Sequence, residues 1–197
     1  YVLALAFAQA RGTVTAEEFK KLTAELAAIP EKIEKLLEHK ERIQWFASKR
    51  ANMEHAFFIG RGLDYAAGLE GSLKMKEISY IHSEAYPAGE LKHGTISLIE
   101  EDTLVIGLLT QQALYEKTLS NLLECKSRGA YLMALTMEGN YSIEDSADFV
   151  IYIPKTDSHF APSLAVIPLQ LLGYYLSVSK GLDVDKPRNL AKSVTVE

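Results

Sequence analysis

The sequence predicts an α/β fold in which about five parallel strands form a doubly wound sheet flanked by helices. Two observations indicate this fold class. Short apolar runs, typical of strands buried on both faces, alternate with longer segments of helical periodicity. Hydrophobic residues make up 48% of the 197 residues, which is ample for a packed core. Strands alternating with helices favour a parallel sheet, whose ligands bind at the carboxyl ends of the strands.

The first 51 residues are expected to form a helical connector that leads into a domain covering residues 52–197. Its helices are predicted over residues 1–10, 15–28 and 30–50. Gly12 stands where helices commonly end, and Thr15 with Glu18 forms the sequence pattern of a capping box. Because the chain starts at Tyr1, inside an apolar helical segment, we expect it to be a piece of a longer protein with a preceding domain.

The remainder of the chain supplies the sheet and its covering helices. Strands are predicted at residues 56–59, 82–88, 103–109, 131–135 and 149–153, and helices at 63–81, 111–128 and 163–180. The last helix is almost wholly apolar, which indicates deep burial, and a bend is expected near Pro168. No apolar run is expected to reach the ~18 residues of a membrane span, so no contact with a membrane is predicted.

The predicted helix at residues 63–81 is the segment around which the rest of the chain is organised. Glu70, Lys74 and Glu77 stand at i, i+4 and i+7 and therefore share a narrow arc of that helix. The opposite side carries mostly small residues, namely Gly68, Gly71, Ser72, Met75 and Ser79. This mixture predicts a buried helix with its charges aimed into a cleft. Spacing alone favours the alternative of solvated ion pairs on a surface helix.

A glycine turn precedes this helix. Gly60, Arg61 and Gly62 follow an apolar strand and stand at its carboxyl end, just before a helix N-terminus that favours an anion. The turn is no dinucleotide fingerprint, because the third glycine of that motif is replaced by Tyr65, and no phosphate-loop lysine follows. We expect these three residues to contribute to substrate binding.

Composition narrows the function further. The net charge of −5 and the pI of about 5.6 do not indicate a basic surface for binding nucleic acid. Cys125 is the single cysteine, so it is expected to be a structural thiol in a reducing cytoplasm. His39 and Trp45 have no second ligand at metal spacing, and neither a metal nor a cofactor is predicted.

Two stretches, IGRGLDYAAGLEGSLKMKEISYIHSEAYPAGELKHG at residues 59–94 and DVDKPRNLAKSVTVE at 183–197, resemble a known family. The chain is similar, essentially throughout, to the second sugar-isomerase (SIS) domain of the glutamine–fructose-6-phosphate aminotransferases. Those enzymes form glucosamine 6-phosphate for the hexosamine pathway. The resemblance implies the SIS fold and a part in ketose-to-aldose isomerisation of a sugar phosphate.

The resemblance also implies a role for individual residues. Glu77 corresponds to the base that moves a proton between C1 and C2 of the sugar, with Lys74 and Glu70 as its neighbours. His93, in the GELKHG motif, corresponds to the ring-opening histidine, which the family supplies from the neighbouring subunit of a homodimer. Lys192 corresponds to the lysine that forms a Schiff base with the open sugar, and the adjacent Ala191 is expected to contact substrate.

Two parts of the family's enzyme are expected to lie outside this chain. They are the phosphate-binding loop of the first SIS domain and the glutaminase domain that releases ammonia. At the corresponding place this chain has Thr110, Gln111 and Gln112, which are poor in hydroxyl groups. We therefore expect the chain alone to be weak or inactive. A non-catalytic sugar-phosphate-binding regulator and a stand-alone deglycase or isomerase remain as alternatives.

Overall fold

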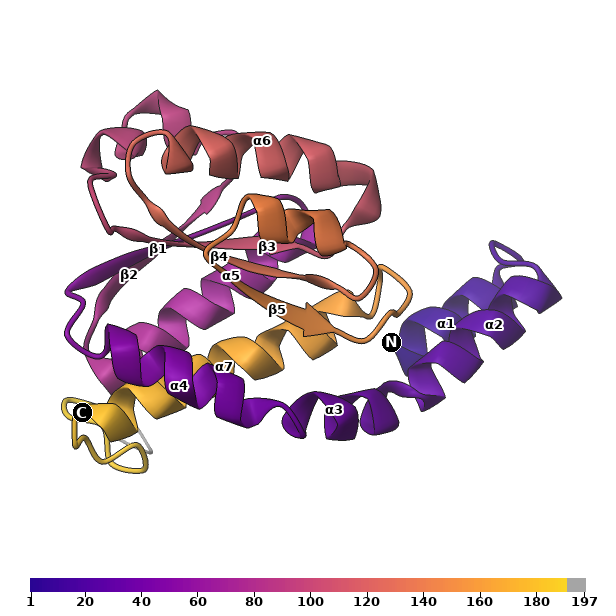
Figure 1. Cartoon of the computed structure of the whole chain (residues 1–197). Coiled ribbons are helices and arrows are strands. Elements are labelled where there is room, and N and C mark those ends of the chain that lie inside the picture. The colour runs from indigo at the N-terminus through magenta and orange to yellow at the C-terminus, as the bar shows by residue number, and fades with distance from the viewer. Residues whose placement is uncertain (191–197) are drawn as a thin grey trace, which may run out of the picture.

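A five-stranded parallel sheet forms the middle layer of the molecule (Figure 1), and the computed structural model describes residues 1–190. The strands are β1 (His55–Gly60), β2 (His82–Pro87), β3 (Leu104–Leu109), β4 (Tyr131–Met137) and β5 (Phe149–Ile153). Their order, β2-β1-β3-β4-β5, reverses the direction of winding between β1 and β3. The predicted doubly wound sheet of five strands is confirmed.

Helices cover both faces of the sheet, as Figure 1 shows. One face carries α6 (Tyr115–Lys126), and the other carries α4 (Lys40–Arg50), α5 (Leu63–Lys74) and α7 (Ala161–Ser179). Successive side chains of a strand point to opposite faces. Accordingly Phe58 joins the core beneath α5 and α7, whereas its neighbour Phe57 joins the core beneath α6. Five short helical turns complete the described chain: η1 (Met75–Ser79), η2 (Leu91–His93), η3 (Thr95–Leu98), η4 (Gln112–Leu114) and η5 (Tyr141–Asp145).

The N-terminal connector consists of α1 (Val2–Ala10), α2 (Ala16–Ala27) and α3 (Ile29–Leu37) before it reaches α4. The predicted capping box is confirmed, since the Glu18 amide donates to Thr15 Oγ1 at 3.2 Å and the Thr15 amide donates to Glu18 Oε2 at 2.8 Å. Gly12 has the positive φ of 65° expected just after a helix.

The single helix predicted over residues 30–50 is wrong, because the structure has two helices with a break at Glu38 and His39. No proline or glycine marks this break in the sequence. Packing explains it, since α4 lies against α7 and buries Phe46, whose ring stacks on Phe149 at 4.3 Å between centroids. The predicted helix at 111–128 begins later than expected, with the short turn η4 ahead of α6.

The helix α7 corrects the expectation about apolar runs. It spans 19 residues, and its best 18-residue window has a mean hydropathy of 1.3, so by length and composition it is sufficient to cross a membrane. Half of that window is buried, and α7 packs against α3, α4 and α5. It is therefore arranged as a core helix of the α/β fold.

Candidate functional site

The three charged residues predicted on one arc of α5 do lie together. Lys74 Nζ is 2.6 Å from Glu77 Oε2 and 3.8 Å from Glu70 Oε1. The hydrogen bond to Glu77 raises the pKa of Lys74, and the charges of Glu77 and Glu70 add to this effect while partial burial opposes it. Lys74 is therefore held as an ammonium ion between two carboxylates.

The small-residue side of α5 is buried, as predicted, and it allows close packing. At Gly71 a Cβ atom would lie 2.7 Å from Leu169 and 2.9 Å from Phe58, so this position accommodates no larger side chain without movement. The predicted burial of the charged side is wrong. Leu69 and Leu73 beside the charges are 47% and 43% exposed, and the side chains of Glu70, Lys74 and Glu77 are also partly exposed.

Glu77 lies in a π-helical turn that could not be predicted from the sequence. After Lys74 the α-helix continues as the π-helical turn η1, and Tyr80 ends it with a left-handed φ of 58°. The Ser79 hydroxyl donates to the Met75 carbonyl at 2.6 Å within this turn. Single π-helical turns occur frequently at functional sites, and a bulky residue with positive φ is a further sign of a constrained site.

The C-terminal stretch returns to this turn. The backbone N–H of Arg188 donates to the Tyr80 hydroxyl at 2.8 Å, and the Arg188 guanidinium carbon lies 4.1 Å from the centre of the Tyr80 ring. Sequence reasoning missed both residues, because they are 108 positions apart and neither carries a motif signal on its own. Lys192 and Ala191, predicted as site residues, lie outside the described residues.

The glycine turn after β1 has a clear structural role. A Cβ atom at Gly60 would lie 2.7 Å from the backbone of Asp64, so only glycine fits where the turn meets the helix. Gly62 has a φ of 57°. The Arg61 guanidinium points to α6, where Nη2 donates to Asn121 Oδ1 at 2.8 Å. Gly60, Arg61 and Gly62 therefore lie together, and they are separate from the charged group on α5.

Asp64, which sequence reasoning missed, closes the switch point between β1 and β3. Its carboxylate accepts the Thr110 amide at 2.8 Å, the Gln111 amide at 3.1 Å and the Thr110 hydroxyl. Burial raises the pKa of Asp64, and the hydrogen bonds from Thr110 and Gln111 oppose that shift. An acidic residue in the first turn of a helix is common, so the sequence held no signal for this contact.

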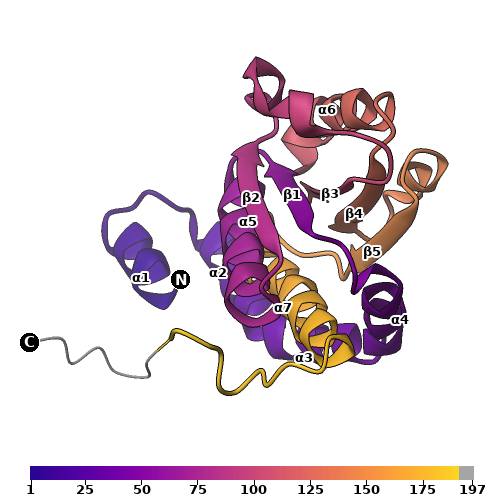
Figure 2. The ribbon, with the colours of Figure 1, turned by 90° about the vertical axis from the view of Figure 1, so that its left-hand side faces the viewer.

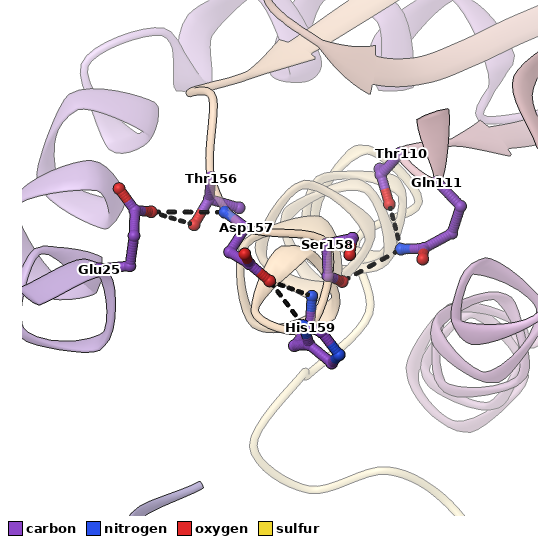
Figure 3. A network of polar contacts seen from close by, with 7 residues as sticks. All are labelled: Glu25, Thr110, Gln111, Thr156, Asp157, Ser158 and His159. Atoms are coloured by element: carbon purple, nitrogen blue, oxygen red, sulfur yellow. Dashed lines mark hydrogen bonds and ion pairs between the residues drawn. The ribbon is translucent and has the colours of Figure 1, made fainter. Parts of the chain in front are cut away.

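Further polar contacts brace the same edge of the sheet (Figure 3). The Gln111 side-chain amide donates to the Ser158 carbonyl at 3.2 Å, which joins the end of β3 to the loop before α7. Glu25 of α2 accepts the Thr156 hydroxyl at 3.1 Å and the Asp157 amide at 3.3 Å. The connector is thereby fixed to the loop that follows β5.

His93 lies at the opposite end of β2 from Glu77. Pairing of His55 with His82 and of Gly60 with Pro87 shows that β1 and β2 run in register from the same edge. Glu77 comes just before β2 begins, whereas His93 follows its end, and a six-residue strand spans roughly 16 Å. Figures 1 and 2 both place the loop with η2 at the far end of the sheet from the C-terminal stretch. Within one chain, therefore, the structure does not bring these two residues together.

Other reactive side chains offer little chemistry. Cys125 is fully buried in α6, and this burial raises the pKa of its thiol to about 11. Among residues 1–190, no group of three or more His, Cys, Asp or Glu side chains is arranged to hold a metal ion.

The fold and the charged helix define the class of protein. The family model "SIS domain" matches residues 51–180, and the chain belongs to this family.

Within the family, the chain is similar along its whole length to one kind of enzyme. It is 58% identical to glutamine–fructose-6-phosphate aminotransferase [isomerizing] of Caldanaerobacter subterraneus subsp. tengcongensis and 59% identical to that of Clostridium tetani, each over 197 residues. The chain spans 32% of the length of each of these curated relatives. Among solved structures, the C-terminal domain of glucosamine-fructose-6-phosphate aminotransferase from Francisella tularensis matches with a TM-score of 0.87 and 35% identity, over 94% of this chain and 52% of that one. The resemblance drawn from the sequence is confirmed.

Proposed function

We propose that this chain carries the isomerisation chemistry of a glutamine–fructose-6-phosphate aminotransferase. The complete enzyme would convert fructose 6-phosphate and glutamine to glucosamine 6-phosphate and glutamate. One observation supports this most strongly. All 197 residues of this chain match such enzymes, and Lys74 at the end of α5 forms a 2.6 Å ion pair with Glu77 in the π-helical turn η1.

Glu77 is proposed as the base that carries a proton between C1 and C2. Such a base must be a carboxylate within reach of substrate, and Glu77 is partly exposed beside the open surface of α5. The ammonium of Lys74, with Glu70 on its other side, would place positive charge beside a substrate that binds at Glu77. The uncovered surface is the side on which we expect the preceding SIS domain of a longer chain to complete the pocket.

The Schiff base requires a different lysine. Lys74 is held protonated by its two carboxylates, so its nitrogen has no free electron pair for attack on a carbonyl. Lys192 is proposed for this step. Its amine would add to the C2 carbonyl of the open ketose with loss of water, and ammonia from glutamine would then displace the lysine from C2.

His93 is proposed to open the sugar ring from a neighbouring copy of the chain. The separation of His93 and Glu77 along β2 supports a homodimer with shared sites, because one chain alone keeps the two residues at opposite ends of this strand. A two-fold dimer would provide two equivalent sites of this kind.

The remaining substrate contacts are proposed at two places. Gly60, Arg61 and Gly62, before the N-terminus of α5, would favour an anionic group of the sugar, and Ala191 would contact substrate beside Lys192. The glutaminase and first SIS domains are proposed partners within the longer chain. We propose a cytoplasmic location, supported by the single buried thiol of Cys125.

The test uses the longer protein that we propose contains this chain. Glu77→Gln should lower fructose 6-phosphate isomerisation by about two orders of magnitude, the usual worth of a general base. Glu31→Gln is a matched control, since Glu31 forms a similar 2.7 Å pair with Lys35 on α3. Lys192→Ala should abolish the sugar adduct that borohydride traps. If both Glu77→Gln and Lys192→Ala retain full activity, the assignment is refuted.

The chain by itself is proposed to be weak or inactive, because it spans about a third of its relatives. Glucosamine 6-phosphate formation from glutamine by residues 1–197 should be close to background, and rapid turnover would contradict the proposal. A non-catalytic regulator would instead bind sugar phosphate equally well after Glu77→Gln or Lys192→Ala. A stand-alone deglycase or isomerase would depend on Glu77 as a base but not on Lys192.

A further inference from the structure

The contact between Tyr80 and Arg188 joins the end of the chain to the turn that carries Glu77. Tyr80 stands three residues after Glu77, at the end of η1. It engages Arg188 in two ways, as the acceptor of the Arg188 backbone N–H at 2.8 Å and as the ring beneath the guanidinium at 4.1 Å. The Tyr80 side chain therefore contacts both the backbone and the side chain of Arg188.

Backbone geometry on both sides of the contact supports a dedicated role. Tyr80 has a φ of 58° and Asn189, next to Arg188, has a φ of 62°. A left-handed φ is unusual for a bulky residue such as Tyr80 and persists only where the surroundings enforce it, whereas asparagine adopts it more readily. Two of the three non-glycine residues with positive φ in the described chain thus lie at this one contact.

We infer that Tyr80 is a positioning residue, a latch that holds the C-terminal stretch through Arg188 beside the turn of Glu77. Arg188 stands four residues before Lys192 in the sequence. Four residues reach at most about 14 Å, so a fixed Arg188 limits the region that Lys192 can reach. The latch therefore couples the proton-transfer carboxylate to the Schiff-base lysine, and in this respect the inference rests on the proposed function.

The first measurement is independent of activity. In the longer protein, Tyr80→Phe removes the hydroxyl acceptor and keeps the ring. Amide hydrogen exchange at Arg188 should become roughly two- to tenfold faster, the equilibrium worth of one neutral hydrogen bond. Tyr141→Phe, at an exposed tyrosine of η5, is the matched control and should leave that exchange unchanged. An unchanged Arg188 amide in Tyr80→Phe overturns the latch.

The second measurement asks whether Tyr80 acts through the lysine. Borohydride trapping of fructose 6-phosphate on Lys192 should slow in Tyr80→Phe by a similar factor. Arg188→Ala should also slow it, and Arg188→Lys, which restores a cation over the ring, should recover part of the rate. In a Lys192→Ala background, Tyr80→Phe should cause no further loss of isomerase activity, since coupled residues are not additive.

The outcomes separate the two ideas. If the double variant loses isomerase activity by the product of the factors for Tyr80→Phe and Lys192→Ala, Tyr80 acts independently of Lys192. The latch would then be wrong, while the proposed function stands. If Lys192→Ala alone keeps activity and still traps the sugar, the Schiff-base role proposed for Lys192 fails, whatever the Tyr80 variants do.

Discussion

Replacing Asp64 tests how the switch point between β1 and β3 is held closed. The buried carboxylate accepts three donors, namely the amides of Thr110 and Gln111 and the Thr110 hydroxyl. Asp64→Ala leaves them without a partner. Each buried donor left unsatisfied costs about 1–3 kcal/mol. The substitution also removes the desolvation penalty of the buried carboxylate, and this gain offsets part of the total cost. We expect a net loss of about 2–4 kcal/mol in the free energy of unfolding.

Asp64→Asn is the matched control, because its geometry can keep the contacts. Its amide oxygen can accept both backbone N–H groups, and its NH2 group can donate to Thr110 Oγ1. The loss should be below about 1 kcal/mol. Urea unfolding of the chain measures both variants. The reasoning is refuted if Asp64→Ala unfolds like the parent, or if Asp64→Asn is as damaging as Asp64→Ala.

The same residue predicts a pH dependence. Burial raises the pKa of Asp64 in the folded chain, so folding favours its protonated form. Its contribution to stability is complete below the unfolded pKa of about 4 and is lost as the pH rises through the higher folded value. The parent should therefore lose stability relative to Asp64→Asn as the pH rises across that window. If the difference in free energy of unfolding between the two proteins does not change with pH, the pKa of Asp64 is not raised.

Two further predictions concern packing and reactivity. Gly71→Ala should destabilise the chain by about 1–3 kcal/mol, because its Cβ would lie 2.7 Å from Leu169. Gly68→Ala, on the same face, meets Phe58 at an ordinary 3.5 Å and should stabilise α5 by up to about 1 kcal/mol; equal urea midpoints for the two variants would contradict this packing. Cys125, fully buried with its thiol pKa raised to about 11, should resist a disulfide reagent at pH 8 in the native chain and react once unfolded, and rapid native labelling would disprove its burial.

The sheet could be predicted from the sequence because its strands are strongly apolar and its helices strongly periodic. The apolar run at Leu104–Leu109 is buried at every position, which is the pattern of a central parallel strand. The break before α4 could not be predicted, because it depends on where Phe46 meets Phe149, a contact between residues far apart in the chain.

In the candidate site, too, the features that depend on local spacing were predicted and those that depend on tertiary packing were not. Local spacing predicted the arc of Glu70, Lys74 and Glu77, since residues at i, i+4 and i+7 lie on one side of any helix. The π-helical turn, the bond from Thr110 to Asp64 and the contact of Arg188 with Tyr80 escaped notice. Each depends on tertiary packing, and the last two join residues 46 and 108 positions apart.

The central claim is that Glu77 of one copy works with His93 of another, and subunit complementation tests it most directly. Glu77→Gln and His93→Ala versions of the longer protein, each inactive alone, would be unfolded, mixed in equal amounts and refolded. If sites are shared in a two-fold dimer, half of the dimers are mixed and each mixed dimer has one intact site, so about a quarter of the parent activity should return. Mixed dimers that form and yet remain inactive would contradict the account.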